Sequence, residues 1–270
     1  HLSFHVDKGQ IYGFLGPNGA GKSTTMNIMT GYIASTSGEV LIDGHNILEE
    51  PEAAKKCIGY LPEQPPLYFD MTVAEYLKFA AELKKVPKNE RETQIEQVME
   101  LTGITAMANR LIKNLSKGYK QRVGLAQAIL GYPEIIILDE PTVGLDPKQI
   151  IEIRELIRKL SEEHTIILSS HILSEVSAVC DYIMIINHGK LVASDTTENL
   201  MNHSLGSNTL ELTVKGEKQD IEKMLRDVEE IQKLEWKPGE NEKTVSMVIT
   251  TEEKTDIREK LFYMMAEAKM

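Results

Sequence analysis

The sequence has few cysteines and no excess of basic residues, and each absence narrows the functions open to it. Its two cysteines, Cys57 and Cys180, lie far apart in a chain of 270 residues and form no CxxC pair. We interpret them as reduced thiols of a cytoplasmic protein, packed as small apolar groups. The formal net charge is −11. This charge argues against nucleic acid as a partner, because binding to phosphate backbones favours a basic face.

Long apolar runs are also missing. The longest, such as EIIILDE at 134–140, are far shorter than the ~20 apolar residues of a membrane-spanning helix. No basic stretch followed by an apolar one opens the chain, so nothing indicates secretion. The chain begins at His1 with a segment that reads as the middle of a sheet, and we therefore expect a domain truncated at its N-terminus.

Strand and helix patterns alternate up to about residue 202. Continuous apolar runs at 135–138 and 165–168 are typical of strands in a parallel sheet that is covered on both faces. Between them, the spacing at 150–163 predicts an amphipathic helix, and a mostly helical stretch extends from about 72 to 130. A hairpin is expected to turn at 187–190. This alternation predicts an α/β fold with its site at the carboxyl edge of the sheet.

The pattern changes after a polar, glycine-containing segment at 203–208, which has the composition of a linker. Beyond it, alternating and helical apolar spacings predict the order β-α-β-β-α. We expect a small accessory α+β, ferredoxin-like domain at 209–270 whose final strand is missing. It contains no catalytic constellation, and its role could be to regulate, to dimerise or to stabilise.

Two details of this second domain make specific predictions. Thr250 and Glu253 have the spacing of a capping box, which predicts that the last helix begins there. Ile257, Leu261 and Met264 then share one face of that helix, and we expect them to be its buried stripe. The methionines near the end of the chain are accordingly interpreted as core and not as a binding surface.

The segment GPNGAGKST matches the pattern G-x-x-x-x-G-K-[ST] between a predicted strand and a predicted helix. Glycines allow the backbone N–H groups to wrap a phosphate chain, Lys22 can reach the β- and γ-phosphates, and the Ser23 hydroxyl can bind Mg²⁺. The alternative is a chance glycine turn. The nucleotide-binding residues that we predict here are Gly16, Pro17, Asn18, Gly19, Ala20, Gly21, Lys22, Ser23 and Thr24.

Two adjacent carboxylates follow the apolar run at 135–138. Asp139 emerges close to where the phosphate-binding segment must lie, and we expect it to hold Mg²⁺ directly or through water. Glu140 points the other way and can polarise an attacking water as the catalytic base. A solvated strand end would explain either carboxylate alone. His171 ends the next apolar run, where we expect it to contact the γ-phosphate; the alternative is a structural histidine.

A second anion site is predicted in NLSKGYKQR at 114–122. Ser116 stands just ahead of a helical run with Gly118 two places on, so a side-chain cap and bare backbone N–H groups meet at one helix N-terminus. The chain already has a complete phosphate loop, and the residues alone do not say which phosphate the second site would bind.

The segments GPNGAGKST, LPEQ, LSKGYKQR, IILDEPTVGLDP and SSH resemble, in this order, the ATP-binding subunits of ABC transporters. The resemblance extends from about Leu2 to Met201. It is closest to ATPases of the type-2 exporter class and, within that class, to those associated with gliding motility and with multidrug or polysaccharide export. It implies a P-loop NTPase cassette at 1–202, with a mixed, mainly parallel sheet and a helical subdomain at about 65–130.

The resemblance also implies site residues. Gln64 occupies the position where the family senses Mg²⁺ and water and couples to the membrane subunit, so it is expected to be both catalytic and a metal ligand. Asp146 matches the D-loop, which touches an opposing cassette. Ser116 and Gly118 match the signature motif and are expected to close over the γ-phosphate held by that cassette. ATP then joins two subunits, and its hydrolysis lets them part.

Two residues depart from the usual signature sequence, since Lys117 replaces a glycine and Tyr119 a glutamine. Lys117 opposes the helix dipole, and our hypothesis is that it adds a cation near the partner's triphosphate or near its own dimer edge. A solvated lysine without effect is the alternative. The aromatic residue that stacks on adenine in this family is expected before His1, and Tyr12 is assigned to the core.

The function implied is that of an ATPase that binds ATP and Mg²⁺ and powers export. Its expected partners are integral-membrane permease subunits and a second copy of itself or a paralogous cassette, without nucleic acid. Its expected location is peripheral, on the cytoplasmic face of the inner membrane. Helical residues after Gln64 would present a groove to the permease. The alternatives are an import ATPase or a soluble ABC protein of ribosomes or DNA repair, although those usually carry two cassettes or a long coiled coil.

Overall fold

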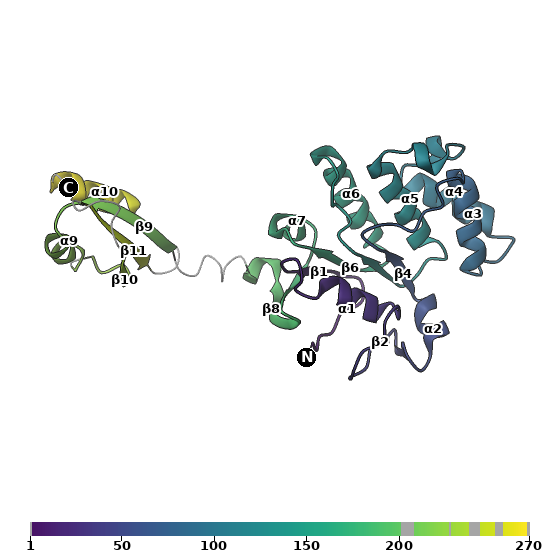
Figure 1. Cartoon of the computed structure of the whole chain (residues 1–270), viewed down its shortest axis with the longest axis horizontal. Coiled ribbons are helices and arrows are strands. Elements are labelled where there is room, and N and C mark those ends of the chain that lie inside the picture. The colour runs from purple at the N-terminus through teal and green to yellow at the C-terminus, as the bar shows by residue number, and fades with distance from the viewer. Residues whose placement is uncertain (1, 201–207, 227, 238–243, 252–255, 269–270) are drawn as a thin grey trace. The chain divides into compact units, whose positions relative to one another are not determined.

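The computed structural model of the chain has a six-stranded sheet at the centre of its N-terminal unit (Figure 1). All neighbours pair in parallel except the last two, which are antiparallel. This mixed, mainly parallel sheet confirms the predicted α/β fold. Across the sheet, the strands are β4 (Ile58–Leu61), β5 (Ile135–Leu138), β6 (Thr165–Ser170), β1 (Ile11–Leu15), β7 (Tyr182–Asn187) and β8 (Lys190–Thr196).

The structure describes residues 2–200, 208–226, 228–237, 244–251 and 256–268. By its contacts, the chain divides into two compact units, His1–Thr197 and Glu198–Met270. Most of the linker predicted at 203–208 lies outside the described residues, and β9 of the second unit already begins at Asn208.

The central strands are hydrophobic on both faces because helices cover both. All of β6 is buried, as are the last three residues of β5, and the β-branched isoleucines that dominate them suit a pleated, enclosed surface. The predicted hairpin is also confirmed, since β7 and β8 pair around a two-residue turn. His188 (φ +47°) and Gly189 (φ +68°) both adopt the left-handed conformation that such short turns require.

Helices follow the strands as predicted. Thr72 begins α3 with a capping box, because its hydroxyl accepts from the Glu75 N–H and the Glu75 carboxylate accepts from the Thr72 N–H. The helical region of the sequence contains α3, α4 and α5, which Figure 1 shows grouped beyond the β4 side of the sheet. The helices of this unit are α1 (Lys22–Met29), α2 (Pro51–Lys56), α3 (Val73–Leu83), α4 (Arg91–Leu101), α5 (Lys117–Ile129), α6 (Pro147–Leu160) and α7 (Leu173–Ser177). Two 3₁₀ turns, Thr105–Met107 and Ile112–Asn114, and a small hairpin of β2 (Leu41–Ile42) and β3 (His45–Asn46) complete it.

The end of α5 packs directly on strand β4 at Gly59. A Cβ atom placed on Gly59 would lie 2.3 Å from the carbonyl oxygen of Ala128 and 2.9 Å from Cγ of Pro133. Backbone therefore meets backbone here, and only glycine leaves the space. This close contact fixes the far end of the helix whose N-terminus carries Ser116.

The second unit has the predicted β-α-β-β-α order. Its elements are β9 (Asn208–Lys215), α9 (Lys218–Leu225), β10 (Ile231–Lys237), β11 (Thr244–Thr251) and α10 (Arg258–Glu267). The strand order is β10-β11-β9, with β11 antiparallel to both neighbours. A separate hydrophobic core joins the sheet to the helices through Val214, Ile221, Leu225, Val228, Met247, Ile249, Ile257, Leu261 and Met265.

The predicted start of the last helix is wrong. Thr250 lies within β11 and pairs with Thr209 and Lys233, whereas α10 begins at Arg258; Glu253 lies outside the described residues. A run of β-branched residues extends the strand through Thr251, and strand pairing outweighs the local cap pattern. The buried stripe is also shifted, because Met265 joins Ile257 and Leu261 in the core while Met264 is partly buried.

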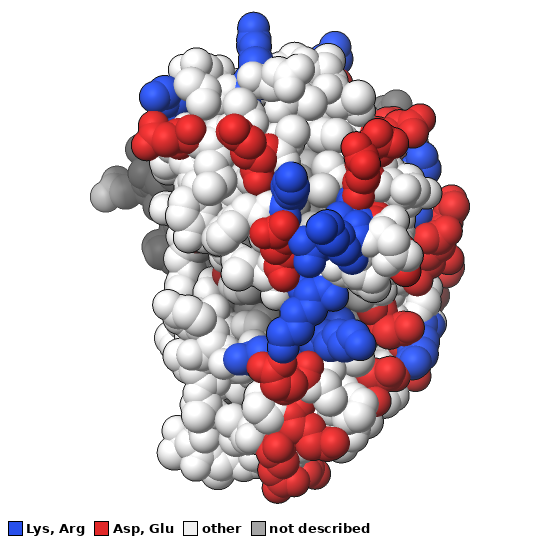
Figure 2. All heavy atoms as spheres, turned by 90° about the vertical axis from the view of Figure 1, so that its right-hand side faces the viewer, with Lys and Arg blue, Asp and Glu red and all other residues white. Residues whose placement is uncertain are grey.

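The surface and the helices add two observations. On the side of the molecule seen in Figure 2, basic and acidic side chains are interspersed, with basic ones near the centre of the face and acidic ones around them. Within the described ranges, no helix combines the length and the apolar character of a membrane span.

We predict that Gly59→Ala lowers the free energy of unfolding by about 3 kcal/mol or more, because the added methyl group would overpack a backbone contact. Gly9→Ala is the control, since a Cβ there meets nothing within 4 Å and only the φ of +76° opposes it, at about 1–2 kcal/mol. Urea unfolding of both variants measures the difference. Equal losses would contradict the packing of α5 on β4.

Candidate active site

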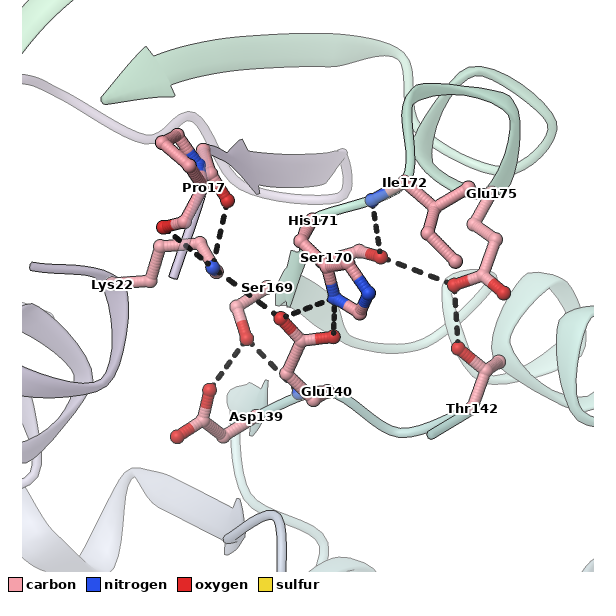
Figure 3. A network of polar contacts seen from close by, with 11 residues as sticks. Pro17, Lys22, Asp139, Glu140, Thr142, Ser169, Ser170, His171, Ile172 and Glu175 are labelled. Carbon is pink, nitrogen blue, oxygen red and sulfur yellow. Dashed lines mark hydrogen bonds and ion pairs between the residues drawn. The ribbon is translucent and has the colours of Figure 1, made fainter. Parts of the chain in front are cut away.

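The carboxyl ends of β5, β6 and β1 lie side by side, because these strands are neighbours in the parallel sheet. The loops that leave them therefore meet at one edge, as expected for a parallel sheet. They bring together the phosphate-binding segment, the two carboxylates after β5 and His171 after β6 (Figure 3).

The segment 16–24 has the backbone that a phosphate loop needs. Gly19 (φ +79°) and Gly21 (φ +106°) are left-handed, and a Cβ on Gly16 would lie 2.3 Å from the carbonyl oxygen of Ile186. Gly21 is the N-cap of α1 and provides no side-chain cap. The first N–H groups of α1 therefore lack a side-chain acceptor and can bind an anion.

Lys22, the first residue of α1, is buried beside the phosphate-binding segment. Its Nζ donates to the carbonyl oxygens of Gly16 (2.8 Å) and Pro17 (3.4 Å). The same atom lies 3.4 Å from Oε1 of Glu140, and both side chains are over nine-tenths buried. A buried cation needs such partners, since an uncompensated charge in the interior is costly.

Ser169 holds the two carboxylate residues in place. Its hydroxyl donates to Oδ1 of Asp139 (2.5 Å) and accepts from the N–H of Glu140 (2.9 Å). Glu140 has a φ of +47°, a left-handed conformation that is strained for a residue other than glycine. This turn gives the two carboxylates different partners, because Asp139 contacts Ser169 and Glu140 contacts Lys22 and His171.

His171 follows β6 and lies beside the Glu140 carboxylate. Its Nδ1 is 3.2 Å from Oε1 and 3.0 Å from Oε2 of Glu140. The imidazole is 41% exposed, whereas the carboxylate is 8% exposed. The buried carboxylate therefore has a basic nitrogen on each side, one from Lys22 and one from the imidazole (Figure 3).

A second set of hydrogen bonds ties the loop after β5 to the loop after β6. Glu175 accepts from the hydroxyls of Thr142 (2.7 Å) and Ser170 (3.1 Å), and Ser170 in turn accepts from the N–H of Ile172 (3.1 Å). Sequence reasoning missed this network and the role of Ser169. The available signal was a pair of hydroxyls at the end of an otherwise apolar, buried strand.

Tyr60 borders the site from β4. Burial, and to a lesser extent the negative charge of Asp139, raise the pKa of Tyr60 to about 12. Its hydroxyl therefore stays protonated in the physiological range and donates to Oδ1 of Asn27 at 3.3 Å.

The other predicted site residues do not join the network around Glu140. Ser23 and Thr24 are exposed at the start of α1, and Gln64 is exposed in the segment after β4. Among the described residues, no hydrogen bond connects the Gln64 side chain to either carboxylate. Their hydroxyl and amide oxygens and the carboxylate of Asp139 are nevertheless the type of hard oxygen ligand that Mg²⁺ prefers.

The metal fit depends on substrate phosphates. Within the described residues, no group of three or more His, Cys, Asp or Glu side chains could hold a metal ion. Mg²⁺ is usually bound through one or two carboxylates together with phosphates and waters. Asp139 with Ser23 would fit that arrangement if the expected phosphate chain supplied the remaining ligands.

Ser116, Gly118 and Asp146 form a second cluster. Ser116 caps α5, with its hydroxyl accepting from the N–H of Tyr119 (3.4 Å), and Asp146 caps α6, with its carboxylate accepting from the N–H of Gln149 (2.9 Å). A groove of about 610 Å³ runs beside them.

Two of the other expectations are confirmed, since Tyr12 is buried and stacks on Tyr182 and both cysteines are free.

Comparison with known proteins identifies this arrangement. Residues 1–143 match the family model described as ABC transporter. The chain belongs to the ABC transporter family. It is 43% identical over 194 residues to the bacitracin transport ATP-binding protein BcrA of Bacillus licheniformis, a match that covers 71% of this chain and 62% of BcrA. It is 37% identical over 216 residues to the linearmycin resistance ATP-binding protein LnrL of Bacillus subtilis, covering 80% of this chain and 70% of LnrL.

The chain covers only part of the length of some relatives. It spans 23% of ABC transporter A family member 1 of Dictyostelium discoideum. Solved ABC structures share its fold. CbiO1 of Clostridium perfringens, part of the ABC transporter complex cbiONQ, superposes with a TM-score of 0.69 at 27% identity, covering 84% of this chain and 87% of CbiO1. The cassette MJ0796, in a dimeric post-hydrolysis state with ADP and Pi, has a TM-score of 0.65 at 26% identity, covering 72% and 88%.

We predict that Ser169→Ala lowers the unfolding free energy by about 1–3 kcal/mol, because it leaves a buried N–H and a carboxylate without a partner. We also expect it to lower the rate of ATP hydrolysis by about 10- to 100-fold, because Ser169 positions the carboxylate that we expect to bind Mg²⁺. Ser170→Ala is the matched control, since its hydroxyl binds Glu175 and not Asp139. Similar hydrolysis rates in both variants would contradict the role of Ser169.

Proposed function

We propose that this chain is the ATP-binding and ATP-hydrolysing subunit of an ABC exporter, in which two cassettes dimerise around ATP and drive transport through a membrane permease. The cassette would occupy 1–202 and the domain at 209–270 an accessory position. The observation that carries the proposal is the buried carboxylate of Glu140. It lies between Lys22, at the end of the phosphate-binding segment, and His171.

The geometry supports a distinct role for each group. The N–H groups of 16–24 would wrap the phosphates, and Lys22 would bind the β- and γ-phosphates. Bound Mg²⁺, held by Ser23, Gln64 and Asp139, would neutralise phosphate charge. Glu140 would orient and polarise the attacking water, and His171 would contact the γ-phosphate while holding Glu140 in place.

The reaction is an in-line displacement. The water oxygen attacks the γ-phosphorus while the bond between that phosphorus and the β,γ-bridging oxygen breaks. The products are ADP and phosphate. The chain contributes mostly the positioning of the reacting groups and the stabilisation of charge. Lys22 stabilises the negative charge on the phosphoryl oxygens, and Glu140 accepts the proton that the attacking water loses. No covalent intermediate on the protein is needed.

The second cluster supports a sandwich of two cassettes. Ser116 and Gly118 lie at the N-terminus of α5, where N–H groups and the helix dipole favour an anion. Their own chain already has a phosphate loop, so the γ-phosphate they meet would belong to a second copy or to a paralogous cassette, with Asp146 alongside. The dimeric state of MJ0796 with ADP and Pi supports this arrangement.

The names of relatives support export. BcrA is a bacitracin transport ATP-binding protein and LnrL is a linearmycin resistance ATP-binding protein, and removal of a drug from the cell fits both. We place the chain in the type-2 exporter class, near the ATPases associated with gliding motility. It would sit on the cytoplasmic face of the inner membrane, bound to integral-membrane permease subunits.

We propose that the segment after β4 is the surface that meets the permease. Tyr68 and Phe69, four and five residues after Gln64, are 54% and 51% exposed, and Nζ of Lys120 lies 5.3 Å from the Phe69 ring centre. Exposed aromatic side chains are favoured at protein interfaces. Their position next to Gln64 would connect the permease to the nucleotide.

We predict that Glu140→Gln retains ATP binding, lowers the hydrolysis rate by about 10²- to 10⁴-fold through loss of the base, and traps an ATP-bound dimer. Turnover assays and light scattering with ATP and Mg²⁺ measure the two effects. Glu134→Gln is the control, because this exposed glutamate precedes the same strand. Hydrolysis by Glu140→Gln at the wild-type rate would overturn the assignment of the base.

We also predict that the double variant Tyr68→Ser, Phe69→Ser loses co-purification with a multi-span membrane protein while it keeps ATP-driven dimerisation in solution. Leu83→Ser is the control, because Leu83 is an equally exposed apolar residue at the end of α3. Affinity purification from detergent-solubilised membranes distinguishes them. Equal recovery of the membrane protein with both variants would remove the docking assignment.

A further inference from the structure

A glycine lies near the N-terminus of each of the helices α5 and α6. A long side chain from the start of the other helix packs against each of these glycines. Lys117 is the first residue of α5, and a Cβ on Gly144 would lie 2.1 Å from its Nζ and 3.1 Å from its Cε. Gln149 lies in the first turn of α6, and a Cβ on Gly118 would lie 2.7 Å from its Cδ. The contacts are reciprocal, because each segment supplies one glycine and one long side chain.

A side chain at either glycine would have a different effect. Gly144 has a φ of +71°, so its backbone and its space both favour glycine. Gly118 is helical and has no such backbone requirement. A Cβ at Gly118 would displace the end of the Gln149 side chain from its present place against α5, and this effect is separate from any approach of a phosphate.

Charge does not explain the position of Lys117. A cation in the first turn of a helix opposes the helix dipole, and among the described residues no ion pair joins Lys117 to an acidic side chain. What its side chain does contact is the loop between β5 and α6 at Gly144. The contact is made by the end of the exposed Lys117 side chain, with Nζ nearest to Gly144 and Cε and Cδ behind it.

A third contact continues the same line. One turn further along both helices, Arg122 of α5 pairs with Glu152 of α6 at 2.5 Å. Arg122 also donates to the carbonyl oxygen of Thr102, just after α4, at 2.9 Å. The helical region is thus joined to α6 along one seam, which we define as Lys117–Gly144, Gln149–Gly118 and Arg122–Glu152.

We propose that Lys117 and Gln149 are positioning residues that hold the N-terminus of α5 and the loop 144–149 as one unit, so that Ser116 and Asp146 meet a partner cassette together. The inference rests on the proposed ATP sandwich. Holding both groups in place before association removes part of the ordering cost of dimerisation. Lys117, which replaces the usual signature glycine, would thus position a loop of its own chain.

The first test is ATP-driven dimerisation in the Glu140→Gln background, measured by sedimentation. Lys117→Ala and Gln149→Ala are each expected to weaken the dimer by about 3- to 30-fold, while the affinity of the monomer for ATP stays unchanged because the phosphate loop is untouched. The double variant should lose less than the product of the two single effects, since both act on one seam. Lys148→Ala removes a neighbouring exposed lysine and serves as the control.

Lys117→Met separates packing from charge. It keeps an unbranched stem that can replace the contacts of Lys117 Cδ and Cε with Gly144, and it removes the ammonium group, which lies nearest to Gly144. The proposal expects it to restore most of the dimer affinity lost in Lys117→Ala. If Lys117→Met behaves like Lys117→Ala, the charge is what matters and the positioning role is overturned. A lower melting temperature with unchanged dimer affinity would likewise reduce the contacts to a purely structural role.

The second test does not depend on ATP. In hydrogen exchange, Lys117→Ala should accelerate amide exchange at 144–149, and Gln149→Ala should accelerate it at 117–121. Changes confined to the substituted segment would overturn the seam even if the dimer forms. If the Glu140→Gln protein itself does not dimerise with ATP, the proposed sandwich fails, and the exchange data still decide whether the seam exists.

Discussion

The buried ion pair between Lys22 and Glu140 is the constraint on which the site depends. Lys22 belongs to the loop after β1 and Glu140 to the loop after β5, and β6 lies between these two strands in the sheet. The contact can form only if all three strands end at the same level. Ser169 supplies that alignment from the middle strand, because it binds both residues that follow β5. The hydrogen bonds of Ser169 therefore depend on the register of the sheet. The register in turn sets the distance between Lys22 and Glu140.

Most of this arrangement was predictable from the sequence. GPNGAGKST, Asp139, Glu140 and His171 each end an apolar run, and parallel strands place such ends together. What the sequence could not supply is the order of the strands. Nothing in the local pattern of β1 indicates that it lies between β6 and β7, because strand order is decided by contacts between distant segments. Ser169 was missed for this reason: its role exists only once β6 is known to lie beside β5.

The wrong start of the last helix shows the opposite limit. Thr250 and Glu253 fit a capping box locally, yet Thr250 pairs with two strands. A cap contributes about 1 kcal/mol, whereas a central strand position combines ladder hydrogen bonds with burial against a core. Lys117 is a similar case. Its effect on the helix dipole is local and unfavourable, and its contact with Gly144 became visible only in three dimensions. Local rules are reliable where tertiary contacts do not compete with them.

Lys22 also imposes an order of events on the proposed cycle. Its Nζ is bound to Gly16, Pro17 and Glu140, and an ammonium group has only three hydrogens to donate. It cannot keep these contacts and also bind a triphosphate. A polyanion is the stronger partner, so ATP would draw Lys22 away and leave the Glu140 carboxylate with His171 alone. The oxygen that contacted Lys22 would then be free to accept a hydrogen bond from water. Binding of the substrate would thus release the base that acts on it, and without nucleotide the same base stays neutralised by the lysine.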